Sequence, residues 1–189
     1  MFVRNGSVWS EQAKLYAADG AAGDHFGTSV ALSGDTVLIG AEWADDAEHE
    51  DCGAAYVFTR NAGQWGPHVR LAPTEVRHQE LFGAAVALSG DTAVVGARDA
   101  DNASASEAGA AFVFIRDGGL WQQQARLSSN DSQTHDGFAW EIALFEGRVL
   151  IGARRDGSAL SGNHWVGSAY VFDMALLFAD GLEDAGAAQ

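Results

Sequence analysis

The chain has 189 residues and a mass of 19.9 kDa, enough for one ordinary domain or for an array of small repeated units. Hydrophobic residues make up 47% of the composition and charged residues 20%, so the chain has a core and is not disordered. Eleven Lys and Arg residues oppose 26 Asp and Glu residues, and this net charge of -15 excludes nucleic acid as a partner, because a polyanion is repelled.

A repeat of constant period runs through the chain. The residue number advances by 56 from Trp9 to Trp65 and again from Trp65 to Trp121, and a Gly-Ala pair keeps the same interval at 40–41, 96–97 and 152–153. The last unit is longer, since the number advances by 58 from Phe112 to Tyr170, and this predicts a two-residue insertion in the loop 158–164. A constant period of this length predicts equivalent structural units.

The first residues, 1–15, precede the first complete unit. Phe2 is in register with Phe58, at the end of a third strand, and the residues from Trp9 to Leu15 follow as a fourth strand. We therefore expect 1–15 to contain an orphan outer strand. If copies of the chain assemble to complete a ring, this strand is expected to pair with the open last unit of its own chain or of another chain.

Each unit predicts four short antiparallel strands. The second unit shows them most clearly, at 82–88, 93–97, 109–115 and 121–127. Gly90 and Asp91 join the first two strands as a tight hairpin, because Gly adopts the positive φ that such a turn requires. The second and third strands are apolar without alternation, so both of their faces are expected to be buried. The fourth alternates and carries charge, as an edge strand does.

Such sheets, packed radially, form a β-propeller, whereas a linear stack of β-coils has much shorter repeats. We expect an all-β, β-propeller-type array of four-stranded antiparallel blades over 1–172, with blades at about 26–71, 82–127 and 138–172. The remainder, 173–189, is expected to be a C-terminal strand and a loose tail. Propellers have roughly four to eight blades. The chain is therefore expected to be part of a longer propeller, with upstream blades, or to complete a ring as a homo-oligomer.

The residues from Phe26 to Ala41, FGTSVALSGDTVLIGA, resemble the FG-GAP repeat. Residues 82–97 match it again, and 53–58 resemble its next strand, so the resemblance covers nearly all of 2–172. This repeat is the blade of the integrin α-subunit head and of many bacterial extracellular proteins. The resemblance implies a β-propeller with an adhesion or ligand-binding role, extracellular or at the cell surface in the full-length form, and implies no enzyme activity.

The chain shows no targeting or membrane-spanning segment. Residues 1–6 show no signal peptide. No apolar run approaches the roughly 20 residues of a membrane span, so we expect no membrane insertion.

Calcium-binding repeats of this family carry an Asp-rich loop between the first two strands. The corresponding turns, 33–36, 89–92 and 145–148, each hold a single carboxylate. Calcium takes roughly six to eight oxygen ligands, so the chain resembles the bacterial type that lacks the calcium loop. The acidic loop 42–51, with six carboxylates, is the alternative place for calcium; the simpler expectation is a solvated loop of like charges.

Carboxylates that recur in register are expected to be structural. Asp24, Glu80 and Asp136 each precede the recurring Phe by two positions, and we expect them to accept hydrogen bonds from backbone groups of the turn. The single cysteine, Cys52, excludes a disulfide framework and a multi-cysteine zinc site, and is expected to be a small residue of a loop or the core. No cofactor is predicted.

Trp140 and Glu141 break the repeat on the first strand of the third unit, which in a propeller faces the central channel. An aromatic ring beside a carboxylate predicts contact with a protein or glycan ligand, with local repacking as the simpler alternative. A carboxylate hydrolase or lyase, with Glu141 as the first suspect, is a second hypothesis, although glycosidases use two carboxylates. A structural scaffold within a longer polypeptide is the third.

Overall fold

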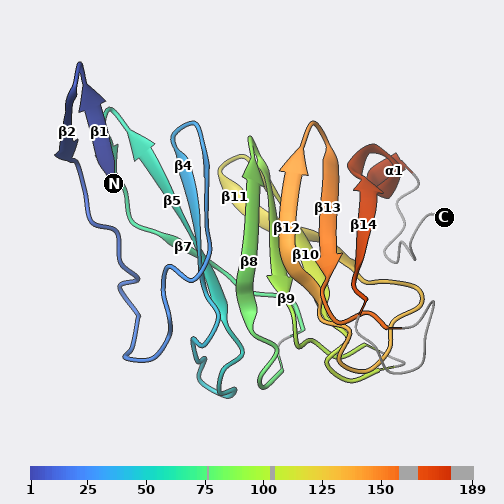
Figure 1. Cartoon of the computed structure of the whole chain (residues 1–189). Helices are drawn as coiled ribbons and strands as arrows, with labels where there is room; N and C mark the ends of the chain where they lie inside the picture. Colours follow the sequence, from blue (N-terminus) through green and yellow to red (C-terminus); the bar gives the residue numbers. More distant parts are fainter. Residues whose placement is uncertain (76, 103–104, 158–165, 180–189) are drawn as a thin grey trace.

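The structure is a computed structural model that describes residues 1–75, 77–102, 105–157 and 166–179. Its four sheets are antiparallel and lie side by side in chain order, with the N-terminus at one end of the array and the C-terminus at the other (Figure 1). The predicted fold class, an all-β array of antiparallel sheets, is confirmed.

An N-terminal hairpin forms the first and smallest sheet. Strands β1 (Phe2–Asn5) and β2 (Val8–Glu11) pair with each other, and the residues 12–15 that were expected to continue the second strand are not part of a strand. The hairpin lies at the opposite end of the array from the last strand (Figure 1). The prediction that this strand pairs with the last unit of its own chain is therefore wrong in this structure, because two complete sheets separate them.

The next sheet contains five strands: β3 (Val30–Ser33), β4 (Thr36–Ala41), β5 (Ala54–Asn61), β6 (Gln64–Trp65) and β7 (Val69–Leu71). Strands β6 and β7 both pair with β5 and together occupy the place of the expected fourth strand. Pro67 lies between them, and because proline has no backbone N–H to donate, the strand is interrupted there.

The following two sheets repeat this order of strands. The first of them contains β8 (Phe82–Ser89), β9 (Thr92–Ala97), β10 (Ala110–Asp117) and β11 (Leu120–Leu127). The second contains β12 (Phe138–Phe145), β13 (Arg148–Ala153) and β14 (Ser168–Asp173), and these are its three strands among the described residues. The predicted insertion at 158–164 lies outside the described residues.

The segment after β14 is a helix, α1 (Met174–Ala179), so the predicted C-terminal strand is wrong over these residues. The run contains no β-branched residue, and its Ala, Leu and Met residues favour a helix. Asp173 caps the helix, since its Oδ1 accepts a hydrogen bond of 3.0 Å from the backbone N–H of Ala175. Residues 180–189 of the expected tail lie outside the described part of the chain.

The core is divided among the spaces between neighbouring sheets. Leu38 and Val57 of one sheet pack on Phe82 and Val86 of the next. The same arrangement recurs one sheet further on, where Val94 and Val113 pack on Phe138 of β12. Strand β4 is buried along its whole length, as predicted. The next sheet covers one of its faces, and Leu15, Ala17 and Phe26 of the N-terminal segment pack on the other.

The third repeat departs from this prediction. Strand β13 alternates between exposed and buried residues, and most of β14 is at least partly exposed. One face of this sheet packs on its neighbour, and no other sheet of the described chain covers its second face. The apolar sequence of β13 is therefore that of a strand buried on both faces, but in this structure only one of its faces is covered.

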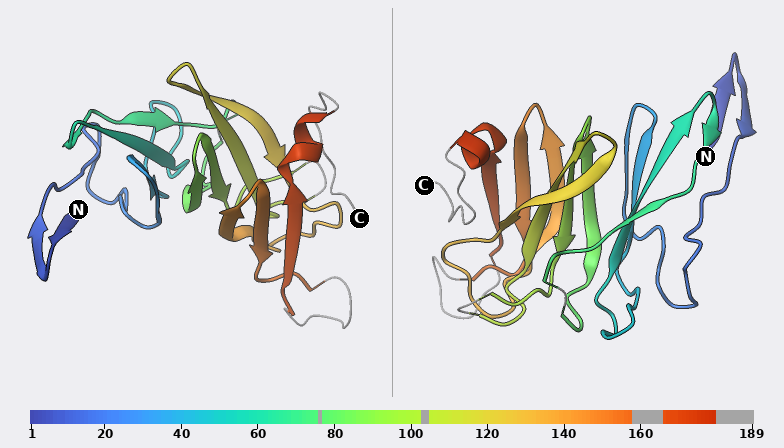
Figure 2. Two further views of the ribbon diagram at one scale, coloured as in Figure 1. Left: turned by 90° about the horizontal axis from the view of Figure 1, so that it is seen from above. Right: turned by 180° about the vertical axis from the view of Figure 1, so that it is seen from behind.

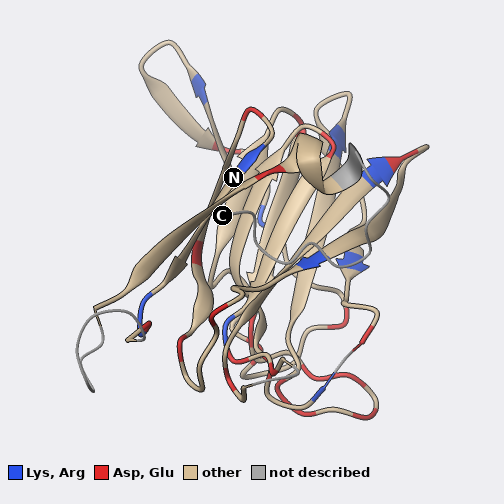
Figure 3. Cartoon of the chain, turned by 90° about the vertical axis from the view of Figure 1, so that its right-hand side faces the viewer, with Lys and Arg blue, Asp and Glu red and all other residues tan. Residues whose placement is uncertain are grey.

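The first strands of the three repeats, β3, β8 and β12, are next to one another along the inner edge of the array (Figure 2). Many of the acidic residues are on the loops at the lower end of the sheets (Figure 3). Among the described residues, no helix is long and apolar enough to cross a membrane.

Candidate functional site

The acidic loop 42–51 folds around its own carboxylates. Oδ1 of Asp46 accepts hydrogen bonds of 2.7 Å from the backbone N–H groups of Glu48 and His49. Oδ1 of Asp45 accepts one of 2.8 Å from the N–H of Asp51. The bond from Glu48 is the main reason that the pKa of Asp46 is lowered to about 2.

The corresponding loop of the next repeat is held in the same way. Asp101 accepts a hydrogen bond from the N–H of Glu107, and the amide oxygen of Asn102 accepts one from the N–H of Ala105. Both hydrogen bonds join residues that follow those of the acidic loop 42–51 by one repeat period of 56 residues. Because the bonds recur with the repeat, these polar side chains stabilise the conformation of the loop. In the described part of the chain, no group of three or more His, Cys, Asp or Glu residues is placed to hold a metal ion.

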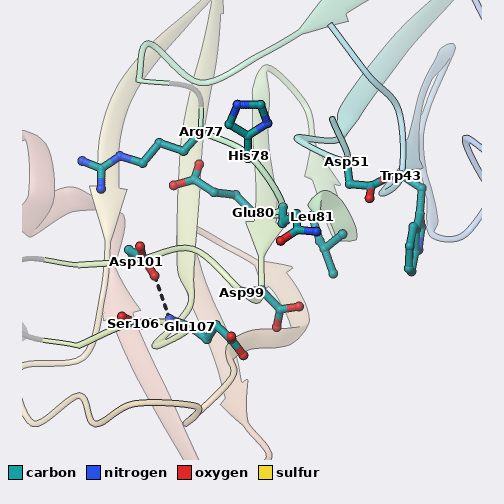
Figure 4. A pocket seen from close by; sticks show the side chains of 11 residues that line it. Trp43, Asp51, Arg77, His78, Glu80, Leu81, Asp99, Asp101, Ser106 and Glu107 are labelled. Atoms are coloured by element: carbon teal, nitrogen blue, oxygen red, sulfur yellow. Dashed lines mark hydrogen bonds between the residues drawn. The ribbon is translucent and has the colours of Figure 1, made fainter. Parts of the chain in front are cut away.

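A cleft of about 400 Å³ opens between these two loops (Figure 4). Its most buried acidic group is Glu80, which is 6% exposed and whose pKa is raised to about 7. Burial is the main cause, and the nearby guanidinium of Arg126 opposes it. Burial also raises the pKa of Asp99, which lines the same cleft. The cleft therefore contains carboxyl groups that bind protons more readily than carboxyl groups in water.

The recurring acids at 24, 80 and 136 are all buried, as expected for structural groups. Oδ2 of Asp24 accepts a hydrogen bond of 2.8 Å from the N–H of Ala21, and Oδ2 of Asp136 accepts one from the N–H of Gln133. These bonds confirm the predicted role for the two aspartates. Glu80 is one methylene longer and its carboxyl group lines the cleft (Figure 4).

Trp140 lies on β12 among three arginines. The guanidinium carbons of Arg98, Arg154 and Arg155 lie 4.8, 3.8 and 5.2 Å from the centre of its ring. Arg98 comes from the neighbouring sheet, where it follows β9, and the other two follow β13. Cation–π contacts of this kind attract a guanidinium to an indole, so Trp140 gathers positive charge in a strongly acidic chain.

The charges of the arginines are compensated to different degrees. Nη1 of Arg98 lies 2.7 Å from Oε2 of Glu42, which is 7% exposed, so this cation is paired. Arg154 is exposed and, within the described residues, forms no ion pair with a carboxylate. A carboxylate of a ligand would therefore find its strongest attraction at Arg154, beside the ring of Trp140.

Glu141 is the second residue predicted for the site, and it is exposed on the same strand. Both predicted residues line an open hollow of about 490 Å³, together with Gly152, Arg154 and Gly167. The structure thus brings the two predicted residues to one hollow.

The arginines around Trp140 were not among the predicted residues. The repeat itself carries the signal that identifies them, because Glu42, Arg98 and Arg154 each follow a Gly-Ala pair at the same position of the repeat. In a radial array such positions meet at the inner edge. At this position the first repeat has Glu42, whereas the second and third have arginines. The arginines lie opposite Trp140, which is itself a departure from the repeat. Two departures at one place mark it as a candidate for function.

Comparison with known proteins identifies the repeat. A model described as the FG-GAP repeat matches the chain three times, at 9–58, 65–114 and 121–172. No curated protein matches the chain. Each match begins at the recurring tryptophan of an outer strand and ends in the third strand of the next sheet, so the matched unit spans two neighbouring sheets. The three matches cover most of the residues, and the chain therefore belongs to the FG-GAP repeat family.

Proposed function

We propose that the chain is a non-catalytic β-propeller module that acts outside the cell or on its surface and binds a protein or glycan through a single carboxylate, since a polyanionic ligand would be repelled by the net charge of -15. Membership of the FG-GAP repeat family supports the general role, since such repeats form propeller-like interaction modules and are usually extracellular. The observation that carries the chemistry of the ligand is the cluster of cation–π contacts between Trp140 and three arginines, of which Arg154 is nearest at 3.8 Å.

The cluster favours a carboxylate for a geometric reason. A guanidinium that rests with its face on an aromatic ring keeps its N–H donors in its own plane, away from the ring. Two of these donors bind both oxygens of one carboxylate at once. Arg98 is already paired with Glu42, so Arg154 is the group that binds and Trp140 is the surface that positions it.

The experiment is an array of glycans and peptides that each carry a single carboxylate, each printed beside its neutral counterpart, and followed by affinity measurements on the best ligand. We expect acidic members to be retained and Arg154→Gln to weaken binding by about tenfold to a hundredfold, as for the loss of a charged hydrogen bond. Trp140→Leu should weaken binding less, because the guanidinium remains without its support. Arg148→Gln is the matched control, since Arg148 is an exposed arginine in the β12–β13 turn.

Two results would contradict this function. Binding to neutral and acidic members alike would show that carboxylates are not recognised. An equal loss in Arg154→Gln and Arg148→Gln would show a general effect of charge instead of a site at Trp140. The hollow at Trp140 also lies on the surface that a second copy of the chain would cover, so ligand and second copy would compete for it. Array binding is therefore read at a dilution where each chain is separate.

A carboxylate hydrolase is the second candidate, and the cleft of Figure 4 favours Glu80 over Glu141 for it. A general acid needs a pKa near the working pH, and that of Glu80 is raised to about 7. Turnover of a polysaccharide that is lost in Glu80→Gln and kept in Glu141→Gln would establish this function. Cys52 does not offer a nucleophile, because it is 3% exposed and burial raises the pKa of its thiol to about 11.

A further inference from the structure

The first and last of the three repeated sheets, those of β3–β7 and β12–β14, expose apolar residues whose counterparts in the other repeats are buried or partly buried. Val86 and Leu88 of β8 are 7% and 8% exposed because the preceding sheet covers them. Their counterparts on β3, Val30 and Leu32, are 66% and 59% exposed. We call the surface formed by Gly27, Val30 and Leu32 the head face.

The opposite end shows the complementary pattern. Leu38 and Val57 are 0% and 2% exposed because the following sheet covers them, and Val94 and Val113 are both fully buried in the same way. The counterparts in the last sheet are Leu150 and Val171, which are 46% and 62% exposed. We call the surface formed by Leu150, Gly152, Gly167 and Val171 the tail face.

Glycines show that the tail face has room for the backbone of another sheet. A Cβ on Gly40 would overlap the carbonyl oxygen of Gly83 in the next sheet, and a Cβ on Gly96 would come within 2.6 Å of the carbonyl oxygen of Ala139. At Gly152, the third member of this series, the nearest atoms belong to Glu141 and lie 3.9 Å away. Nothing within the described chain requires a glycine there.

The hollow beside Gly152 lies where, in the other repeats, the backbone of the next sheet packs. Gly53 and Gly109 each form a parallel bridge to the phenylalanine that opens the next sheet, Phe82 and Phe138. The corresponding glycine, Gly167, lines the hollow together with Gly152. By the same register, the hollow is where the Phe26–Gly27 segment of a head face fits.

A side-chain contact between sheets points to the same pairing. Oγ of Ser29 accepts a hydrogen bond of 3.0 Å from the backbone N–H of Val86 in the next sheet. Glu141 occupies the position of Ser29 in the last sheet, and Val30 occupies the position of Val86 in the first. The exposed carboxylate of Glu141 is thus placed to accept a hydrogen bond from the N–H of Val30 in a second head face.

Among the described residues, the last sheet has no fourth, outer strand, and the N-terminal segment has the sequence position of such a strand. Leu71 of β7 lies opposite Ala55, and Leu127 of β11 lies opposite Ala111. In the described residues no strand pairs with the outer edge of β14. The segment 13–15 precedes β7 by one repeat period and is not part of a strand. Its Leu15 packs on the sheet of β4 and β5, in the same way as Leu71 packs on the sheet of β8 to β11.

We propose that the tail face of one chain binds the head face of a second copy, and that residues 13–15 of that copy add the fourth strand to β14. The occupant is a second copy because this interface continues the one that the chain forms twice within itself. Head and tail lie at opposite ends of the array, so a chain does not reach its own partner surface (Figure 1). Two copies supply six complete sheets, within the range of roughly four to eight that closes a propeller.

The test is light scattering on the purified chain over a range of concentrations. We expect a particle of twice 19.9 kDa, and one that forms more readily at high salt, because each copy carries a charge of -15. Val30→Asp and Leu150→Asp should each give monomers, since a buried charge then faces an apolar surface. Leu120→Asp is the control, because Leu120 is equally exposed but lies in the turn between β10 and β11.

Mixing the two variants distinguishes a head-to-tail contact from a contact of two like faces. The mixture should recover a pair of chains, because the intact tail of Val30→Asp meets the intact head of Leu150→Asp. Gly152→Ala should also give monomers while leaving the circular dichroism spectrum of the chain unchanged. A wild-type chain that stays monomeric at every concentration would overturn the proposal, and so would dimers that survive Gly152→Ala and both aspartate variants.

The strand pairing has its own test in a mixture of Ala13→Cys and Val171→Cys under oxidising conditions. These positions correspond to Val69 and Val57, which lie directly opposite each other. Opposite residues in antiparallel strands are about 4.5–5.5 Å apart at Cα, which suits a disulfide. A crosslinked pair containing one chain of each variant is expected. Its absence in a sample that light scattering shows to be dimeric would overturn the added strand.

Discussion

Arg116 donates a hydrogen bond of 2.6 Å from Nε to Oδ1 of Asp91, and so links the end of β10 to the turn between β8 and β9. The same guanidinium lies 5.3 Å from the centre of the Trp121 ring on β11. Arg60 repeats both contacts one sheet earlier, with a hydrogen bond of 2.7 Å to Asp35 and a distance of 5.6 Å to Trp65. In both sheets the recurring arginine therefore connects the turn between the first two strands with the tryptophan of the outer strand.

Arg116→Met should lower the free energy of unfolding by about 1–2 kcal/mol, because it removes a partly exposed ion pair, a cation–π contact and the hydrogen bond of 3.2 Å that Nη1 donates to Oγ1 of Thr36. Methionine is the natural residue at this position in the last sheet, where Met174 keeps the backbone bond to Gly147. Urea unfolding followed by tryptophan fluorescence measures the change. Arg116→Lys serves as control and should lose less, since it keeps the charge; a loss of several kcal/mol would mean that the contact is part of the core.

Phe82 tests the packing between sheets. It is fully buried and meets Phe112 and Phe114 at ring distances of 5.5 and 6.1 Å. Phe82→Ala should lower the free energy of unfolding by about 3–5 kcal/mol, as for other large-to-small changes in a core. Phe26 makes equivalent contacts with Tyr56 at 5.6 Å but is only partly buried.

The matched variant Phe26→Ala should therefore lose clearly less stability than Phe82→Ala. Both are measured by chemical unfolding at a dilution where the chain is a monomer. Equal losses would contradict the difference in burial between the first sheet and the second, and would indicate that the head face is covered in solution even at that dilution.

Gly40 is a third place where the packing of sheets can be probed. Gly40→Ala places a methyl group against the backbone of Gly83, which cannot move without shifting β8. We expect a loss of about 1–3 kcal/mol, the usual cost of overfilling a packed region. The thermal midpoint measures it. Gly34→Ala is less suitable as a control because the φ of Gly34 is positive, so Gly152→Ala in the monomer is preferred.

The repeat alone predicts much of this fold, because strand positions in an array are copied with the period. Trp65 and Trp121 mark the outer strands, and the Gly-Ala pairs end the second strands, where the structure has them. What the repeat does not predict depends on neighbours. Strand β13 has the apolar sequence of β9, yet one face is exposed, because burial is decided by the adjacent sheet.

Other differences are local. Pro67 divides one outer strand, and the run after Asp173 forms a helix because its residues favour a helix and a cap stands ahead of them. The candidate site combines what the sequence marks and what it does not. Trp140 stands out as a break in the repeat, but its contact with Arg98 of another sheet depends on the packing of the sheets. No pattern within one strand shows such a contact.

Glu80 makes folding depend on pH. Burial raises its pKa from 4.5 to about 7, so between these values the folded chain holds a proton that the unfolded chain releases. Stability is therefore greatest below the pKa of the unfolded state and falls as the pH rises through about 7. The difference amounts to about 3 kcal/mol at most. Glu80→Gln should remove most of this fall and should be the more stable protein above pH 7.

Urea unfolding between pH 5 and pH 8 measures this effect in both proteins. Glu11→Gln is the control, because Glu11 is an exposed carboxylate of the N-terminal hairpin whose charge does not act on Glu80, so its loss should leave the pH dependence in place. Burial also raises the pKa values of Asp99 and Asp136, and these two groups account for a remaining slope at lower pH. A Glu80→Gln variant that follows the same curve as the wild type would mean that Glu80 is charged in the folded chain, paired with Arg126, and it would remove the basis for a general acid in the cleft.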